Sequence, residues 1–465
     1  MALKVLMVAS ELSPYAKTGG LGEVIGVLTK ELRNQGVDAR AVFPKYKNLS
    51  KFNHLTQICN FPVNINFQNH DAIVFSVDDK KNHIYTIEND YFFLRDNMYG
   101  YDDDYFRFYF FTLAVFEFIK QLDFKPDIIH FNDWQVGLGS FYLKESLSDN
   151  SFYSNISTIF SIHNIQHQGN FEKDILEKLG IEEYYFNPNM IELYDKVSFM
   201  KAGILYSDAI TTVSENYAKE IQTPFFSFGL DGVISSRKED LYGIVNGIEY
   251  NDVDNFKTKN KKYLQQKMGL PIKDVPIVSI VTRLAEQKGI DIIVEALNEI
   301  VNKDLQLIIL GVGEEKYEKI FLEYDEKHEN VTANIYFDTD ISIDIYKHSD
   351  IFLMPSLFEP CGIAQMISMK YGTVPIVRKT GGLKDTVIHF DTESKCGNGF
   401  VFEDYNAEGL LWAFDKALET YKNKEDWSHV VSNALNTKFS SEDTAKKYIE
   451  LYKKVLKNKK LNCEI

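Results

Sequence analysis

Two basic side chains stand in a segment that has the pattern of a loop between a strand and a helix. Arg283 and Lys288 are five residues apart in the sequence VTRLAEQKG, which covers residues 281–289. Such loops lie at the carboxyl ends of strands, where open α/β sheets bind their ligands. Two cations there can hold a diphosphate, although two solvated surface charges give the same pattern. Only seven of the 51 basic residues of the chain are arginines, which favours the binding interpretation.

Two glycine pairs share the sequence KTGGL, at residues 17–21 and 379–383, each between a predicted strand and a predicted helix. The first turn of a helix offers unpaired N–H groups and a partial positive charge to phosphate, and glycine lets the backbone come close. A glycine pair alone is more often only a turn. The flanking lysine and threonine favour an anion site. The candidate residues are Lys17, Gly19, Gly20, Thr380, Gly381 and Gly382.

Two more polar residues follow predicted strands. Glu359 lies in MPSLFEPCG, residues 354–362, where Gly362 opens the next helix. A carboxylate beside an anion-binding helix start is electrostatically unfavourable unless it has a task, such as accepting hydrogen bonds from sugar hydroxyl groups. Helix capping is the alternative interpretation. His163 ends an apolar strand and is either structural or a hydrogen-bond partner.

Metal and thiol chemistry are not favoured by the sequence. His130, His163 and His167 lack the spacing of metal ligands, so we expect no metal and no cofactor. Cys361 has no paired base in the sequence, which favours packing over a nucleophilic role.

The elements that must position these residues form two series of short apolar strands alternating with amphipathic helices. The first series has strands at residues 4–10, 127–130, 158–163 and 208–213, with helices at 23–34 and 106–122. The second begins near residue 242 and has strands at 277–281, 305–310, 334–337, 351–354 and 374–377, with helices at 290–300 and 363–371. Wholly apolar strands between helices are typical of a parallel sheet covered on both faces. We therefore predict two doubly wound α/β domains with a boundary near residue 240, approached through a Ser- and Gly-rich stretch at 225–240.

The overall composition is that of a globular chain. Of 465 residues, 45% are hydrophobic and 25% are charged, and the net charge of −16 makes a nucleic-acid partner unexpected. No apolar run approaches the roughly 18 residues of a membrane span, and residues 5–9 are too short for the core of a signal peptide. Four scattered cysteines are typical of the reducing cytoplasm. The oligomeric state is not indicated.

These motifs, taken together and in order, resemble those of bacterial glycogen synthases and plant starch synthases, the ADP-glucose-dependent glycosyltransferase family 5, along nearly the whole chain. The matching segments are residues 17–22, HFNDW (130–134), IHNIQHQGNF (162–171), TTVSENYAKEI (211–221), VNGIEY (245–250), TRLAEQKG (282–289), PSLFEPCG (355–362), YGTVPIVRKTGGLKDTV (371–387) and GNGFVFEDYN (397–406). The resemblance implies the GT-B fold, with two Rossmann-like doubly wound domains facing across a cleft. It implies an acceptor-side domain at residues 1–240, a nucleotide-sugar donor domain at 241–440, and helices at 441–465 that cross back to the first domain.

The resemblance also implies the reaction, which is transfer of glucose with retention from ADP-glucose to the non-reducing 4-hydroxyl group of glycogen or another α-1,4-glucan, without a metal. Residue by residue, it implies that Arg283 and Lys288 stabilise the departing diphosphate and that His163 lines the glucose site. Glu359 would bind glucose hydroxyl groups or act as a covalent nucleophile, and the sequence does not decide between these roles. Physics alone does not choose ADP-glucose over UDP-glucose, because too many aromatic residues could stack on the base.

Further contacts are implied by the same resemblance. Donor binding is expected from Lys17, Gly19, Gly20, Asn246, Gly362, Thr380, Gly381 and Gly382, and acceptor-side contacts from Tyr99 and Asp133. Two rival hypotheses remain. One is another GT-B glucosyltransferase with a small acceptor, and the other is a catalytically inactive glucan-binding subunit. The presence together of Lys17, His163, Arg283, Lys288 and Glu359 argues against the inactive subunit.

Overall fold

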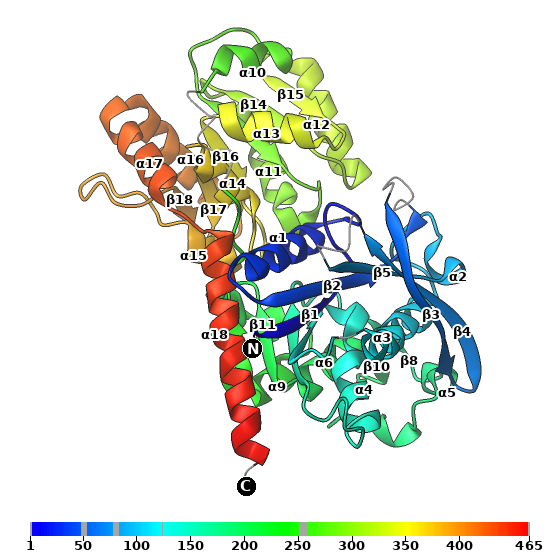
Figure 1. Cartoon of the computed structure of the whole chain (residues 1–465). Coiled ribbons are helices and arrows are strands. Elements are labelled where there is room, and N and C mark those ends of the chain that lie inside the picture. Colours follow the sequence, from blue (N-terminus) through cyan, green and yellow to red (C-terminus); the bar gives the residue numbers. More distant parts are fainter. Residues whose placement is uncertain (1, 48–53, 78–82, 123, 251–258, 464–465) are drawn as a thin grey trace. The chain divides into compact units, whose positions relative to one another are not determined.

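A computed structural model describes residues 2–47, 54–77, 83–122, 124–250 and 259–463. The chain divides into two compact units, shown in Figure 1. The first unit is Met1–Val213, Ala218–Gly247 and Ser441–Ile465, and the second is Ser214–Tyr217 and Ile248–Ser440. Within the described ranges, none of the helices combines the length and the apolar character that crossing a membrane requires.

The first unit is built on a nine-stranded sheet in the order β12-β11-β7-β6-β1-β2-β5-β4-β3. The strands are β1 (Lys4–Val8), β2 (Asp38–Pro44), β3 (Leu55–Ile65), β4 (Gln68–Val77), β5 (Ile84–Glu88), β6 (Ile128–Asn132), β7 (Ser157–Ile162), β11 (Ala209–Thr212) and β12 (Leu241–Gly243). From β12 to β5 in this order the strands are parallel, and β3 and β4 form an antiparallel hairpin on β5. A small antiparallel sheet, β8-β10-β9, consists of β8 (Asn170–Glu172), β9 (Glu192–Leu193) and β10 (Lys196–Ser198).

Helices follow the parallel strands of the first unit because their apolar residues recur at helical spacing. In α1, for example, Val24, Ile25, Leu28 and Leu32 are buried on one face. The helices of this part of the chain are α1 (Gly20–Asn34), α2 (Asp90–Phe93), α3 (Asp104–Gln121), α4 (Leu138–Ser146), α5 (Ile175–Leu179), α6 (Phe199–Tyr206), α7 (Glu215–Glu220), α8 (Pro224–Ser227), α9 (Asp231–Ser236) and α18 (Ser441–Cys463). Its described residues also form the 3₁₀ turns η2 (Trp134–Val136), η3 (Glu183–Tyr185) and η4 (Lys238–Asp240).

The last helix of the chain belongs to the first unit. Figure 1 shows α18 in red, and it packs against the blue α1. A buried chain of polar side chains anchors it: the Tyr452 hydroxyl lies 2.9 Å from His130 Nδ1, His130 Nε2 lies 2.6 Å from Ser161 Oγ, and Ser161 bonds to Thr211. Burial lowers the pKa of His130 to about 3, so this histidine is neutral and can both donate and accept.

The second unit has a six-stranded sheet in the order β15-β14-β13-β16-β17-β18, and all its pairings are parallel. Its strands are β13 (Ile277–Val281), β14 (Gln306–Leu310), β15 (Val331–Asn334), β16 (Ile351–Met354), β17 (Val374–Arg378) and β18 (Phe400–Phe402). Its helices are α10 (Lys261–Lys267), η6 (Glu286–Lys288), α11 (Ile290–Val301), α12 (Glu315–Lys327), α13 (Thr339–His348), α14 (Ala364–Lys370), α15 (Gly381–Thr386), α16 (Ala407–Lys422) and α17 (Lys424–Asn436).

Both units are doubly wound, which confirms the predicted fold class. The strand order reverses between β1 and β6 in the first unit, and between β13 and β16 in the second. Open α/β sheets bind ligands beyond the carboxyl ends of the strands at such a reversal. The loops after β1 and β6, and those after β13 and β16, are therefore the places to examine for a site.

One local expectation was wrong, and one stretch holds elements that were not predicted. The strand predicted at residues 334–337 lies earlier, because Val331–Asn334 pair with β14 and the aromatic residues beyond Asn334 lie outside the ladder. The stretch at 225–240, expected only as the approach to the domain boundary, holds α8, α9 and η4. Short helices with few apolar residues give little periodic signal, so the sequence did not predict them.

Candidate active site

An ion pair marks the strand-order reversal of the second unit. Lys288 comes from the loop after β13 and Glu359 from the loop after β16, and Nζ lies 2.7 Å from Oε2. The Ser356 hydroxyl also donates to Oε2, at 3.0 Å. The side chain of Lys288 is 19% exposed and that of Glu359 is 8% exposed. The geometry thus brings together the cation and the carboxylate that the sequence placed in separate motifs.

The two loops that carry this pair fit against each other through backbone. The Leu357 N–H donates to the Gln287 carbonyl at 3.0 Å. Gly289 has φ of +74°, and a Cβ built there would lie 2.2 Å from the Pro355 carbonyl oxygen. A side chain at this position would push the loops apart, and with them the lysine and the glutamate.

The second glycine pair closes onto the same site. The Gly382 N–H donates to the carbonyls of Glu359 (3.1 Å) and Pro360 (3.2 Å). A Cβ on Gly381 would lie 1.8 Å from the Glu359 carbonyl oxygen, and one on Gly382 would lie 2.1 Å from that of Cys361. The N–H of Gly382 is thus engaged within the protein, whereas the sequence predicted that it would be offered to a phosphate. The glycines let α15 approach the Glu359 loop.

Three other residues of the second unit were predicted for this site, namely Arg283, Thr380 and Gly362. Arg283 is exposed, and its Nη2 donates to Gln287 Oε1 at 3.1 Å. No carboxylate among the described residues pairs with Arg283. Thr380 is buried and stands at the N-cap of α15, and Gly362 has φ of +71° just before α14. The arginine is therefore held loosely by an amide and can turn towards an anion.

In the first unit a buried carboxylate that the sequence argument missed organises the glycine-rich loop. Glu11, in the loop after β1, accepts hydrogen bonds from the Thr18 N–H (2.9 Å), the Thr18 hydroxyl (2.6 Å) and the Gly19 N–H (3.3 Å). The Tyr99 hydroxyl donates to it as well, at 2.9 Å. Glu11 therefore holds the start of α1 and Tyr99 together. Its only sequence signal was a charged residue directly after an apolar strand.

Lys17 and Tyr99 are placed differently in this loop. Lys17 pairs with Glu23 at 2.9 Å, and both side chains are more than one-third exposed, so the pair is weak and can open to a ligand. Tyr99 is half-buried, and Ser10 Oγ lies 2.8 Å from its hydroxyl. Burial raises the pKa of Tyr99 well above its usual value, so its hydroxyl stays protonated. Gly20 is the first residue of α1.

The loop after β6 carries a strained and buried carboxylate. Asp133 has φ of 62° and ψ of 175°, a conformation that residues other than glycine rarely adopt and that is concentrated at functional sites. Its Oδ1 accepts the His163 N–H at 2.7 Å. Burial raises the pKa of Asp133 from 3.8 to about 7, with Glu11 contributing in the same direction. A carboxyl group that titrates near neutrality at a strand-order reversal is a candidate for ligand chemistry.

His163 stands beside it after β7. Its Nε2 lies 3.0 Å from Asn132 Oδ1, and burial lowers the pKa of His163 to about 4. The ring is therefore neutral near pH 7. Asn246 lies beyond β12 in the same unit; it is buried, and its Oδ1 has no hydrogen-bond partner in the part of the chain that the structure describes. An unpaired buried carbonyl of this kind is a ready acceptor for a ligand.

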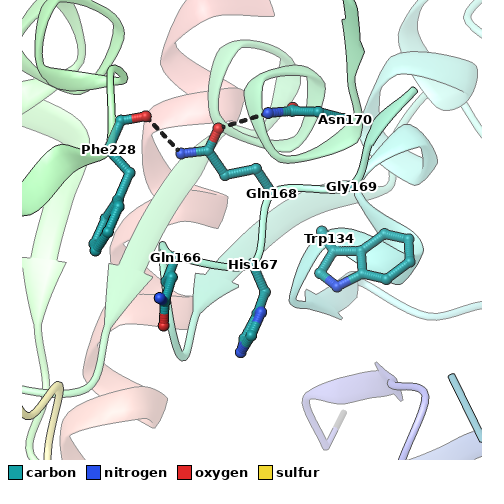
Figure 2. Close-up of a pocket in the computed structure, with 7 residues that line it drawn as sticks. All are labelled: Trp134, Gln166, His167, Gln168, Gly169, Asn170 and Phe228. Atoms are coloured by element: carbon teal, nitrogen blue, oxygen red, sulfur yellow. Dashed lines mark hydrogen bonds between the residues drawn. The ribbon is translucent and has the colours of Figure 1, made fainter. Parts of the chain in front are cut away.

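A pocket of about 470 Å³ opens in the first unit at the segment that follows β7. It is lined by Trp134, Gln166, His167, Gln168, Gly169, Asn170 and Phe228. Figure 2 shows the side chains of Gln166 and His167 pointing to the same side of the loop. Gln168 is fixed by hydrogen bonds to the Phe228 carbonyl and to Asn170, both 3.0 Å long. Aromatic faces with amide groups between them suit a sugar, which offers apolar ring faces and hydroxyl groups.

Two exposed aromatic side chains lie shortly after β15. They are Tyr336 and Phe337 of the second unit, separated from the strand by Ile335, and Phe337 is 75% exposed. Exposed rings at the carboxyl end of a parallel strand are available to a flat ligand.

The structure does not test the predicted metal-free chemistry. Among the residues described, no group of three or more histidine, cysteine, aspartate or glutamate side chains could hold a metal ion.

Comparisons with known protein families match most of the chain. Residues 4–236 match the starch synthase catalytic domain, and residues 264–433 match glycosyl transferases group 1. The chain is 43% identical to the glycogen synthase of Desulforudis audaxviator (strain MP104C), over 97% of this chain and 96% of the relative. It is 44% identical to the glycogen synthase of Clostridium perfringens (strain 13 / Type A), over 98% of this chain and 99% of the relative.

Solved structures give the same picture. The catalytic domain of starch synthase IV from Arabidopsis thaliana, bound to ADP and acarbose, superposes with a TM-score of 0.90 at 29% identity, covering 98% of this chain and all of that one. Sucrose-phosphate synthase from Thermosynechococcus elongatus superposes with a TM-score of 0.64 at 17% identity, covering 98% of this chain and all of that one, which shows a shared fold.

Proposed function

The chain belongs to the family of glycogen and starch synthases, with the GT-B fold, and from this premise we propose that it is an ADP-glucose-dependent glycogen synthase. It transfers glucose, with retention of configuration, to the non-reducing 4-hydroxyl group of an α-1,4-glucan. The observation that carries this assignment is the ion pair of Lys288 and Glu359 at the strand-order reversal of the second unit, with Arg283 in the same loop.

Departure of the diphosphate is the step that the basic residues serve. Negative charge develops on the leaving ADP as the glycosidic bond breaks, and fixed cations aimed at it lower the barrier. Lys288 and Arg283 supply that charge from one loop, so that no metal ion is needed for it. Lys17, held by an exposed ion pair, and the start of α1 at Gly19 and Gly20 are proposed as further donor contacts.

Glu359 has the position and partners for holding the sugar. In the structure its carboxylate bonds to Lys288 and Ser356. When the donor arrives, the lysine can turn to the diphosphate, and the carboxylate then accepts hydrogen bonds from glucose hydroxyl groups. Retention follows either from attack on the face that the leaving group vacates or from two displacements through Glu359. The variant Glu359→Gln distinguishes these two mechanisms of retention, because an amide still binds hydroxyl groups but cannot form a glycosyl ester.

The acceptor is proposed to bind in the first unit. We expect Asp133 and Tyr99 to contact its hydroxyl groups, and the neighbouring pocket offers Trp134 and Phe228 as ring-sized surfaces. The solved relative holds ADP and acarbose, a nucleotide with a sugar-like ligand, which supports the same two ligand classes here. The cytoplasmic location expected from the cysteine content stays a prediction.

The assignment is tested by incubating the purified protein with glycogen and either ADP-glucose or UDP-glucose, without added metal. We expect release of ADP together with elongation of the outer glucan chains. Turnover of ADP-glucose with a small sugar but not with glycogen would favour the transferase with a small acceptor. Glycogen binding with no turnover of either donor would favour the inactive subunit.

The pocket yields a separate prediction for the acceptor. Phe228→Ala is expected to raise KM for a maltooligosaccharide about tenfold, the equivalent of one aromatic contact of ~1.4 kcal/mol, and to leave KM for ADP-glucose unchanged. Phe67→Ala is the matched control, because both phenylalanines are exposed in the first unit and have positive φ. Equal effects of the two substitutions on the acceptor KM would remove the pocket from the acceptor site.

A further inference from the structure

Asn132 is a fully buried residue at the end of β6 whose amide orientation is fixed by its partners. Its Nδ2 donates to the Val8 carbonyl at 3.2 Å and to the His130 carbonyl at 3.0 Å. Backbone carbonyls only accept, so the amide nitrogen must face them. The amide oxygen therefore faces His163, with Oδ1 3.0 Å from Nε2.

This contact assigns the proton on the His163 ring. An amide oxygen cannot donate, so Nε2 must carry the hydrogen. Because burial lowers the pKa of His163 to about 4, the ring holds a single proton near pH 7, and Nδ1 is bare. Within the described ranges Nδ1 has no hydrogen-bond partner, and the residue is partly exposed. The ring thus presents an unprotonated acceptor to whatever occupies the site.

We propose that Asn132 is a positioning residue that holds His163 in the tautomer protonated on Nε2, so that Nδ1 accepts a hydrogen bond from a hydroxyl group of the bound sugar. The sugar as ligand rests on the proposed function, whereas the tautomer rests on the contacts of Asn132 and on the burial of the ring. The main chain of His163 is fixed independently, because its N–H donates to Asp133 Oδ1 at 2.7 Å. Asn132 therefore orients the ring of His163 and Asp133 fixes its backbone, and these two residues are neighbours in the chain.

The substitution Asn132→Leu tests the tautomer with little change of volume. Without the amide oxygen, nothing from that position favours a proton on Nε2, and the neutral ring is expected to exchange between its two tautomers. Protein labelled with ¹⁵N-histidine reports this directly, because protonated and bare imidazole nitrogens have well-separated chemical shifts. The His163 signals are assigned with the variant His163→Gln.

His130 serves as an internal reference in the same spectra. Its ring nitrogens contact the hydroxyl groups of Tyr452 and Ser161, at 2.9 and 2.6 Å, and the Asn132 side chain bonds to His130 only at its backbone carbonyl. We expect Asn132→Leu to move the His163 shifts towards an averaged mixture while those of His130 stay in place. Movement of both would show a general loss of structure at β6 and would overturn the specific role.

Kinetics supplies the functional reading. Asn132→Leu is expected to lower kcat about tenfold, the loss of roughly one hydrogen bond, and adding His163→Gln to it should cost little more. A wild-type spectrum with the proton on Nδ1, or an Asn132→Leu spectrum with unchanged His163 shifts, would overturn the proposal. If the protein transfers no glucose from either donor, the proposed function fails, while the spectra still decide the role of Asn132.

Discussion

Replacing Lys288 with methionine is expected to lower kcat for glucosyl transfer by about 10²- to 10³-fold, the usual cost of removing one group that stabilises transition-state charge. Methionine keeps an unbranched stem of similar length and removes only the ammonium group. KM for ADP-glucose should change less than kcat, because the charge on the diphosphate grows as the bond to glucose breaks.

The same substitution should also destabilise the second unit. Glu359 would lose its cation while its side chain is only 8% exposed, and an unpaired buried charge costs about 3 kcal/mol in the free energy of unfolding. The double variant Lys288→Met/Glu359→Gln removes that charge, and an amide can still accept the hydrogen bond from Ser356. We expect it to regain most of the stability and none of the kcat.

This pair of variants separates catalysis from folding. Steady-state ADP release gives kcat and KM, and urea unfolding gives the stability. Lys303→Met is the matched control, because Lys303 forms a 2.7 Å pair with Asp415 in the same unit and lies in none of the site motifs. Wild-type kcat in Lys288→Met, or recovery of kcat in the double variant, would show that the lysine only supports the fold.

Asp133→Asn is expected to make the protein more stable at pH 8 and less active. The native pKa of Asp133 is raised from 3.8 to about 7. Between these values the folded protein keeps a proton that the unfolded chain releases, so this carboxyl group makes stability fall as the pH rises from about 4 to about 7. Above pH 7 its ionisation costs about 4 kcal/mol, which asparagine does not incur.

Urea unfolding at intervals from pH 4 to pH 8 tests this sign. The gain from Asp133→Asn should be near zero at pH 4 and largest at pH 8, while kcat with glycogen falls about tenfold or more because the acceptor loses its charged partner. Asp208→Asn is the control: Asp208 also accepts a backbone N–H, from Thr158 at 2.8 Å, but has Lys144 3.4 Å away. Its neutralisation should lower stability. A pH-independent gain in Asp133→Asn would contradict the assignment.

The sequence predicted the fold best where burial alone decides the pattern. The strands Ile277–Val281 and Ile351–Met354 have the predicted bounds, because a buried parallel strand is a continuous apolar run. The strand expected at 334–337 lies at Val331–Asn334 instead. The apolar residues after Asn334 lie outside the sheet, and an apolar run in the sequence does not show which of its residues pair with a neighbouring strand. The hairpin of β3 and β4 was not predicted, since one strand contains a proline and many polar residues.

For the site, the sequence could supply chemical types but not partners. It placed Arg283, Lys288 and Glu359 at strand ends, and two of these form an ion pair in the structure. Glu11 and Asn132 were given no role because their roles depend on hydrogen bonds that no local pattern encodes, such as those to Tyr99 and to Val8 and His163. The catalytic roles of these residues are predictions that the variants test.

The anchoring of α18 has a consequence for how the protein is made on the ribosome. The segment Ile248–Ser440, nearly all of the second unit, is continuous and emerges before α18 does, so this unit can complete its core during synthesis. The first unit cannot do so, because Tyr452 supplies the partner of the buried His130 Nδ1 and is synthesised after the whole of Ile248–Ser440. The half of the protein that begins first is therefore expected to finish folding last, and until then its β6 carries a buried polar group awaiting a partner.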